Sequence, residues 1–269
     1  MRHRGSATSV VVGVDGSQSA NQAALWAVDE AVSRDIPLRL VYVIDAPGLP
    51  DSGAELPHLA AARSALDGTR RTVEATGKPV KIETEILWGT PLTKLSEQSR
   101  SAAMICIGSM GIKHACYGEG SVARALPGSA RCPVAVVHRH TRQSPSPDTE
   151  TIVVDAENDL VLQYAFEEAK LRGAPLRAIA LWHAEVPEDL ADANRLARAQ
   201  LDRRITHLRR IYPDVVVESA AFHGDLCRYL AELGESVQLL VTGVNGQRDH
   251  VGTPQRVECT VLTVHGNHL

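Results

Sequence analysis

Glycines and small polar residues gather at the ends of short apolar runs in the first half of the chain. The run "SVVVGVDGS" (9–17) ends in Gly13, Asp15 and Gly16, and the run "AAMICI" leads into "GSMGIKHACYGEGS" (108–121), where four of fourteen residues are glycine. Such loops supply backbone N–H groups that bind anions. A carboxylate such as Asp15 would repel phosphate, but it accepts hydrogen bonds from both hydroxyls of a ribose. The residue types favour a nucleotide ligand.

The glycine-rich stretch is followed by "SVARALPGSA", a helical segment that begins at Ser121. A helix N-terminus carries free N–H groups and a partial positive charge, so a phosphate could be held there without a lysine. A plainer interpretation stays open, because a glycine at a strand exit is commonly a turn and an aspartate in "VDGS" commonly a turn former or helix cap. A Walker motif is absent, and "GEGSVA" does not occupy the strand-to-helix turn of a dinucleotide fingerprint.

Apolar strands alternate with amphipathic helices along the whole chain. After the strand in 9–17, alanines and valines at helical spacing predict a helix on "SANQAALWAVDEAVSRD", with Ser19 available as its cap. This alternation predicts parallel sheets with helices on both faces, whose ligand sites lie at the carboxyl ends of strands where the strand order reverses. The further elements expected in this half are strands in 37–44, 80–87, 102–108 and 133–138 and helices over about 59–75 and from Pro91.

The second half repeats the order of the first. "RDIPLRLVYVIDA" (34–46) matches "RGAPLRAIALWHA" (172–184) at an offset of 138, and "ICIGSMG" (105–111) matches "LVTGVNG" (240–246) at an offset of 135. Between the halves, "RHTRQSPSPDTE" (139–150) has the composition of an exposed linker. We therefore expect two tandem copies of one α/β fold, a domain over 1–142 with the nucleotide-binding loop and a second over 149–269 with a degenerate loop.

The succession "VVVGVDGS", "VYVID", "GSMG", "GSV" and "CPVAVV" resembles the universal stress protein family, and two copies in one chain resemble its tandem members in mycobacteria and related actinobacteria. The resemblance covers essentially the whole chain. It implies two doubly wound, Rossmann-like domains with five-stranded parallel sheets ordered 3-2-1-4-5, and a site for ATP or another adenine nucleotide, with or without Mg²⁺. It places Asp15 at the ribose, the backbone of Val43 beside the adenine and the glycine loop around the phosphates. The cofactor-binding residues it implies are Gly13, Asp15, Val43, Gly108, Ser109, Gly111, Gly120, Ser121 and Val122.

The chain departs from the family pattern G-x2-G-x9-G-[ST] in both copies. Only eight residues (112–119) separate Gly111 from Gly120, and Glu119 precedes the expected phosphate position. In the second copy Asp155 ends the first strand, Gly243 and Gly246 repeat the glycine pair, and too few residues follow for a full closing helix. We expect the second domain to have a truncated last helix and to bind nucleotide weakly or not at all. Without a full helix, no aligned helix dipole is present to attract a phosphate.

Composition narrows the function classes. The net charge is −4 and the arginines are scattered, so nucleic acid is not expected as a partner. No apolar stretch approaches the length of a membrane span, and we expect a cytoplasmic protein. The five cysteines form no CxxC pair, which predicts free thiols and no zinc site, with Cys106 buried in a strand and Cys116 in the glycine loop as a candidate exposed thiol.

No base and nucleophile at catalytic spacing are evident, so no catalytic residue is assigned, and the nucleotide is expected to act as an effector in a stress-response regulator. Two alternatives stay open: an interaction scaffold that binds no nucleotide, and a slow ATPase. The strands in 133–138 and 261–265 would be sheet edges, which predicts pairing of the two halves and leaves a homodimer through the same edges open.

Overall fold

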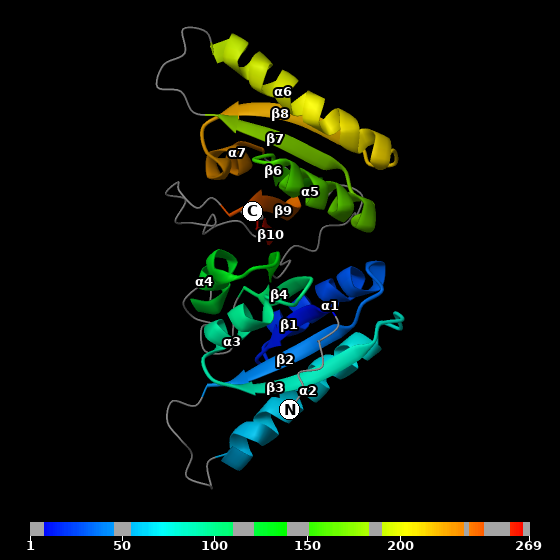
Figure 1. Cartoon of the computed structure of the whole chain (residues 1–269), viewed down its shortest axis with the longest axis vertical. Helices are drawn as coiled ribbons and strands as arrows, with labels where there is room; N and C mark the ends of the chain where they lie inside the picture. The colour runs from blue at the N-terminus through cyan, green and yellow to red at the C-terminus, as the bar shows by residue number, and fades with distance from the viewer. Residues whose placement is uncertain are drawn as a thin grey trace. The chain divides into compact units, whose positions relative to one another are not determined.

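The computed structural model describes residues 8–45, 55–109, 121–138, 151–182, 190–233, 237–244 and 259–265. The chain divides into two compact units, Met1–Arg139 and His140–Leu269, here called the N-terminal and C-terminal units. Figure 1 shows each as a sheet flanked by helices. No described helix is long and apolar enough to cross a membrane.

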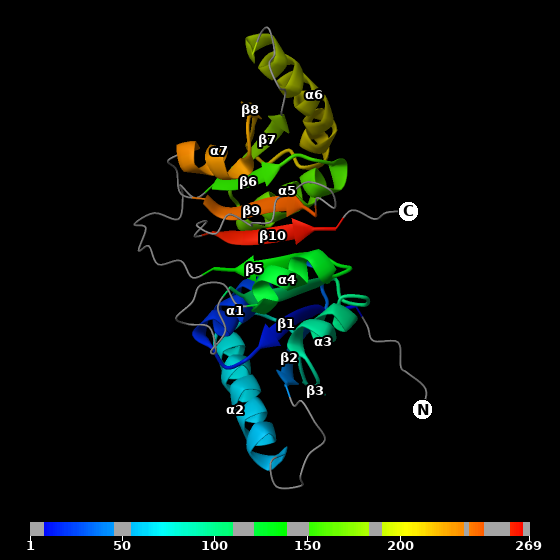
Figure 2. The same cartoon turned by 90° about the vertical axis from the view of Figure 1, so that its left-hand side faces the viewer.

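The N-terminal unit has a parallel sheet ordered β3-β2-β1-β4-β5, as the family resemblance implies. Helices α1 and α2 pack together on one face, and α3 and α4 pack together on the other (Figure 2). Because α1 leaves β1 on one face and α3 enters β4 on the other, the strand order reverses between these two strands. The elements are β1 (Val10–Val14), α1 (Gln18–Ser33), β2 (Leu38–Ile44), α2 (Glu55–Glu74), β3 (Ile82–Trp88), α3 (Pro91–Gln98), β4 (Met104–Gly108), α4 (Ser121–Ser129) and β5 (Val134–Val137).

The C-terminal unit repeats this topology with a sheet ordered β8-β7-β6-β9-β10. Helices α5 and α6 share one side of the sheet and α7 lies on the other (Figure 2). The predicted truncation of its last helix falls on residues 245–258, which lie outside the described residues. The elements are β6 (Thr151–Asp155), α5 (Asp159–Arg172), β7 (Leu176–Trp182), α6 (Leu190–Ile211), β8 (Val217–His223), α7 (Leu226–Leu233), β9 (Val237–Gly243) and β10 (Thr260–Val264).

Helix α1 packs on the sheet through small residues. Its alanines at helical spacing are buried as expected, including Ala20, Ala23 and Ala24. Short side chains let the helix backbone approach the strands closely. The sequence had offered Ser19 as the cap, and this is wrong: the N-cap is Ser17, whose Oγ accepts a hydrogen bond from Ala20 N at 3.0 Å. The helix therefore starts closer to β1, and Ser19 lies in its first turn.

Each unit also buries a glutamate on the helix that follows its first strand. Glu30 in α1 and Glu168 in α5 are both fully buried, and each pairs with an arginine one turn later, Arg34 or Arg172. Buried carboxylates persist where they are paired and hydrogen-bonded. Both pairs stand at the 138-residue offset seen in the sequence, so the repeat extends to a polar detail of the core that the apolar pattern did not predict.

Candidate functional site

The register of the N-terminal sheet brings two of the predicted ligand residues together. Gly13 pairs with Val41 and Val14 with Tyr42, so the next step along both strands sets Asp15 beside Val43. Val12 pairs with Cys106 on the other side of β1, so the chain leaving β4 at Gly108 reaches the same edge of the sheet. Asp15, Val43 and the end of β4 at Gly108 thus meet where the strand order reverses, which is where open α/β sheets bind ligands.

Asp15 builds the turn between β1 and α1. Its Oδ1 accepts a hydrogen bond from Ser17 N at 2.9 Å, and Gly16 between them has a φ of 86°, a conformation that glycine adopts without strain. The turn-forming role left open by the sequence is therefore real. A carboxylate can accept about four hydrogen bonds, so this turn is compatible with a second role toward a ligand.

The two described glycines of the predicted site have packing reasons for lacking a side chain. A Cβ on Gly108 would lie 2.6 Å from the backbone carbon of Ser19, so this glycine lets the first turn of α1 rest on β4. A Cβ on Gly13 would lie 3.0 Å from Ile107 Cγ2 and 3.3 Å from Leu95 Cδ1. The core thus accounts for both, and the ligand contacts expected of them stay predictions.

The residues predicted around the phosphates are only partly described. Ser109 is buried and its N–H donates to Val137 O at 3.0 Å, so its amide serves the β4–β5 pairing. Val122 is half-buried and packs against the core below α4. Ser121 opens α4, so a helix N-terminus stands where the sequence placed it. Gly111, Gly120 and the side chain of Ser121 lie outside the described residues.

The C-terminal unit carries two carboxylates at the corresponding place. Asp155 pairs with Ile179 as Gly13 pairs with Val41, so Asp155 takes the position of Gly13, and Glu157 takes that of Asp15. The sequence analysis predicted that Asp155 ends the first strand of this unit, and β6 does end there. The turn before α5, capped by Asn158, is one residue shorter than the turn before α1, capped by Ser17.

These two carboxylates interact. Asp155 is 8% exposed, and its burial, followed by the negative charge of Glu157 and a hydrogen bond with it, raises the pKa of Asp155 to about 8. Glu157 also lies against β9, since a Cβ on Gly243 would be 2.7 Å from Glu157 Oε2. Gly243 corresponds to Gly108, so the carboxyl group of Glu157 occupies the space beside that glycine.

The described cysteines behave as small apolar residues. Cys106, Cys132 and Cys259 are buried, which confirms the prediction made for Cys106. Burial raises the pKa of Cys132 and of Cys259 to about 12, so neither is a reactive thiolate. Cys116 lies outside the described residues.

Within the described part of the chain, no group of three or more His, Cys, Asp or Glu side chains could hold a metal ion.

Comparisons with known proteins agree with this architecture. The Universal stress protein family model matches residues 7–138. The chain is 51% identical over 264 residues to universal stress protein Rv3134c of Mycobacterium tuberculosis, covering 98% of each, and 43% identical over 277 residues to Rv2028c of the same organism, covering 97% of each. A universal stress protein from Archaeoglobus fulgidus has the same fold, with a TM-score of 0.70, 16% identity and 96% of each chain covered. The chain belongs to the universal stress protein family.

Proposed function

We propose that the N-terminal unit binds an adenine nucleotide at the carboxyl ends of β1, β2 and β4. In this proposal Asp15 binds the ribose, the backbone of Val43 lies beside the adenine, and the phosphates lie at the N-terminus of α4, near Gly111, Gly120 and Ser121. The observation that carries the proposal is the register, which sets Asp15 next to Val43 at the reversal of strand order.

The groups at this edge suit a phosphorylated ligand. α4 begins at Ser121 and runs for nine residues, long enough for its N-terminal N–H groups to attract a phosphate. The groups assigned to the nucleotide are backbone amides and a carboxylate already held in the β1–α1 turn, so we treat the nucleotide as an effector in stress-response regulation. Mg²⁺, if it accompanies ATP, would be held chiefly by the phosphates.

The proposal assigns the nucleotide to one unit. In the C-terminal unit Asp155 fills the position of Gly13, and Glu157 lies against Gly243. The side chain of Asp155 takes up the space that Gly13 leaves open, and the carboxylate of Glu157 opposes the approach of a phosphate along β9. The sequence predicted weak binding there because of the shortened segment after Gly246; the carboxylate pair is a separate reason, found only in the structure.

The interaction scaffold is the second candidate, and one set of observations favours it. Gly13 and Gly108 have packing reasons, and the amide of Ser109 already serves β5. Each of these features would persist in a protein that had lost its ligand. Pairing of the two halves through their fifth strands, and a homodimer, also stay predictions.

Calorimetric titration of the full-length protein with ATP, ADP and AMP separates the two candidates. Asp15→Asn is the informative variant, because its amide oxygen still accepts from Ser17 N while the charge and one acceptor are lost. We expect about a tenfold loss of affinity, the usual consequence of removing one hydrogen bond to a charged group. Glu157→Gln, the matched change in the C-terminal unit, should leave affinity unchanged. Wild-type protein that binds none of the three at millimolar concentration would establish the scaffold.

A further inference from the structure

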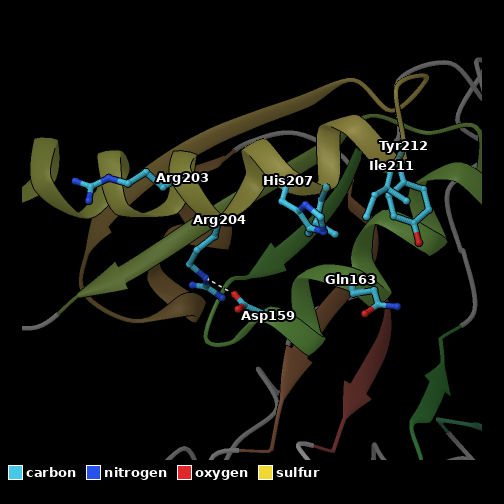
Figure 3. Close-up of a pocket in the computed structure, with 8 residues that line it drawn as sticks. Asp159, Gln163, Arg203, Arg204, His207, Ile211 and Tyr212 are labelled. Atoms are coloured by element: carbon cyan, nitrogen blue, oxygen red, sulfur yellow. Dashed lines mark hydrogen bonds and ion pairs between the residues drawn. The ribbon is translucent and has the colours of Figure 1, made fainter.

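A cavity of about 400 Å³ lies between α5 and α6 of the C-terminal unit, and its polar end adjoins the turn between β6 and α5. We call it the α5–α6 groove. Figure 3 shows Arg204 and His207 projecting from α6 toward Asp159 and Gln163 of α5, while Arg203 lies farther along α6 and points away. This volume is within the range of small-molecule sites.

The N-terminal unit forms the corresponding pair of helices, α1 and α2, without the charged residues that α6 contributes to the groove. The buried positions of α2 and α6 correspond at an offset of 139, as Ala62, Leu66 and Thr69 do to Leu201, Ile205 and Leu208. The same offset sets Ser64, Ala65 and Gly68 against Arg203, Arg204 and His207. Three small neutral residues in one repeat are therefore two arginines and a histidine in the other.

The whole of α6 shows the same change in charge. It carries six arginines and two aspartates, whereas α2 carries three arginines and three carboxylates. Arg198 and Arg209 reach Ser219 and the backbone of Val217 in their own unit, while Arg203 and Arg210 have no hydrogen-bond or ion-pair partner among the described residues. The groove therefore opens beside a surface of net positive charge, which raises the local concentration of anions.

Arg204 closes the polar end of the groove. Its Nε donates to Asp159 Oδ1 and its Nη1 to Ala156 O, both at 2.7 Å, so the side chain ties α6 to the turn before α5. Its Nη2 is buried and has no acceptor among the described residues. A buried donor without an acceptor is uncommon in proteins and costs free energy. The oxygen of an anion would satisfy it after a small movement of the guanidinium.

The other end of the groove is apolar. Ile211 is 51% exposed although it is a large aliphatic residue, and Leu208 lies beside it on the inner side. Tyr212 is fixed by a ring contact with Phe166 at 5.7 Å between centroids and a long hydrogen bond to Glu167. Gln163 is also held, because its amide nitrogen donates to Glu167 Oε1 at 3.0 Å. The apolar end is thus largely preformed, which lowers the cost of binding.

We propose that the α5–α6 groove binds a small organic anion, with a carboxylate or phosphate at His207 and Arg204 and an apolar body against Leu208, Ile211 and Tyr212. Arg203 and Arg210 act from the rim through their charge. This site is separate from the nucleotide site, and each can exist without the other.

Phenyl phosphate is a suitable probe, because it joins a dianionic group to a ring of the right size for the groove. We expect backbone amide shifts of the full-length protein, recorded by ¹H–¹⁵N NMR with ATP at saturation, to move in α5 and α6 on titration. The double variant Arg203→Ser/His207→Ala, which makes the groove resemble the N-terminal unit, should weaken binding about tenfold, as expected on removing charged contacts. Arg195→Ser, elsewhere on α6, should leave the affinity unchanged. Arg204 is left intact because it holds the turn before α5.

Each alternative outcome identifies a specific failure. Equal shifts with benzyl alcohol would show that the anion is not recognised, and equal shifts with inorganic phosphate would show that the apolar end contributes nothing. Unchanged affinity in the double variant would overturn the proposal. So would the absence of amide shifts in α5 and α6 when the probe is in about 10-fold excess over protein at roughly millimolar concentration, because a dissociation constant weaker than that is of no interest. Shifts confined to the N-terminal unit would mean that the probe competes for the nucleotide site instead.

Discussion

The N-terminal and C-terminal units share one backbone plan but differ in the number of carboxyl groups at the place where their strand order reverses. Both sheets follow the order 3-2-1-4-5, and the first strand pairs with the second in the same register. At the two positions closest to the reversal, Gly13 and Asp15 stand in one unit and Asp155 and Glu157 in the other. The backbone plan therefore fixes where a ligand could bind, and the side chains at these two positions decide which groups and how much space it would meet.

The largest expected difference between the units concerns the glycine that ends the fourth strand. Gly108→Ala should lower the stability of the N-terminal unit by about 3 kcal/mol, because the new Cβ would meet the backbone of α1 at 2.6 Å. Gly243→Ala should cost under about 1 kcal/mol, since the atom 2.7 Å away belongs to the movable carboxylate of Glu157. Hydrogen exchange read separately on peptides from each unit measures both. Equal losses would contradict the packing role given to Gly108.

The second difference is a pH dependence confined to the C-terminal unit. The pKa of Asp155 is raised from an ordinary 3.8 to about 8, so the folded state retains a proton that the unfolded state releases. Stability attributable to this proton is fully present below about pH 4 and is lost as the pH rises to about 8. In this window one retained proton corresponds to a slope of about 1.4 kcal/mol per pH unit.

Asp155→Asn should abolish that slope and should make the C-terminal unit more stable than wild type above pH 8. Urea denaturation followed through Trp182, in a background where Trp26 and Trp88 are replaced by Phe, measures the C-terminal unit alone. A slope that survives in Asp155→Asn would assign the proton to another group. Glu157→Gln serves as the partner variant, because removing the neighbouring charge should lower the pKa of Asp155 toward its ordinary value.

The smallest expected effect tests a feature that the units share. Ser17 and Asn158 cap α1 and α5 through the same hydrogen bond, at 3.0 Å in both cases. Ser17→Ala and Asn158→Ala should each cost about 1 kcal/mol in their own unit. Ser19→Ala, the cap expected from the sequence, should cost less than Ser17→Ala. If the two cap substitutions changed the free energy of unfolding by clearly different amounts, the units would differ in their helix caps as well as at the strand ends.

Much of the fold could be predicted from the sequence, because strands and helices leave periodic patterns. The apolar runs predicted every strand of the N-terminal unit to within a few residues, and the 138-residue offset revealed the repeat. α2 begins at Glu55, about four residues earlier than the expected start near Leu59. The strand order 3-2-1-4-5 came from the family resemblance, since periodicity alone does not order the strands of a sheet.

The details of the candidate site were harder to predict, because they depend on contacts between elements. The choice of Ser17 over Ser19 as the cap depends on how Asp15 and Gly16 turn the chain, and the match of Asp155 to Gly13 depends on pairing with β7. The reason for Gly108 could not be read from the sequence, because its neighbour in space is a residue of α1 far away along the chain.

The packing of Gly108 against α1 also affects how motifs in tandem proteins should be interpreted. Gly243 survives at the corresponding position of the unit that places two acidic groups where the ligand would bind. A sequence motif based on the glycine that ends the fourth strand would match both repeats. That glycine is needed for a helix to pack closely on the sheet, so the match does not indicate a ligand. A glycine at this place in both repeats therefore indicates an intact scaffold, and ligand specificity must be inferred from the side chains around it.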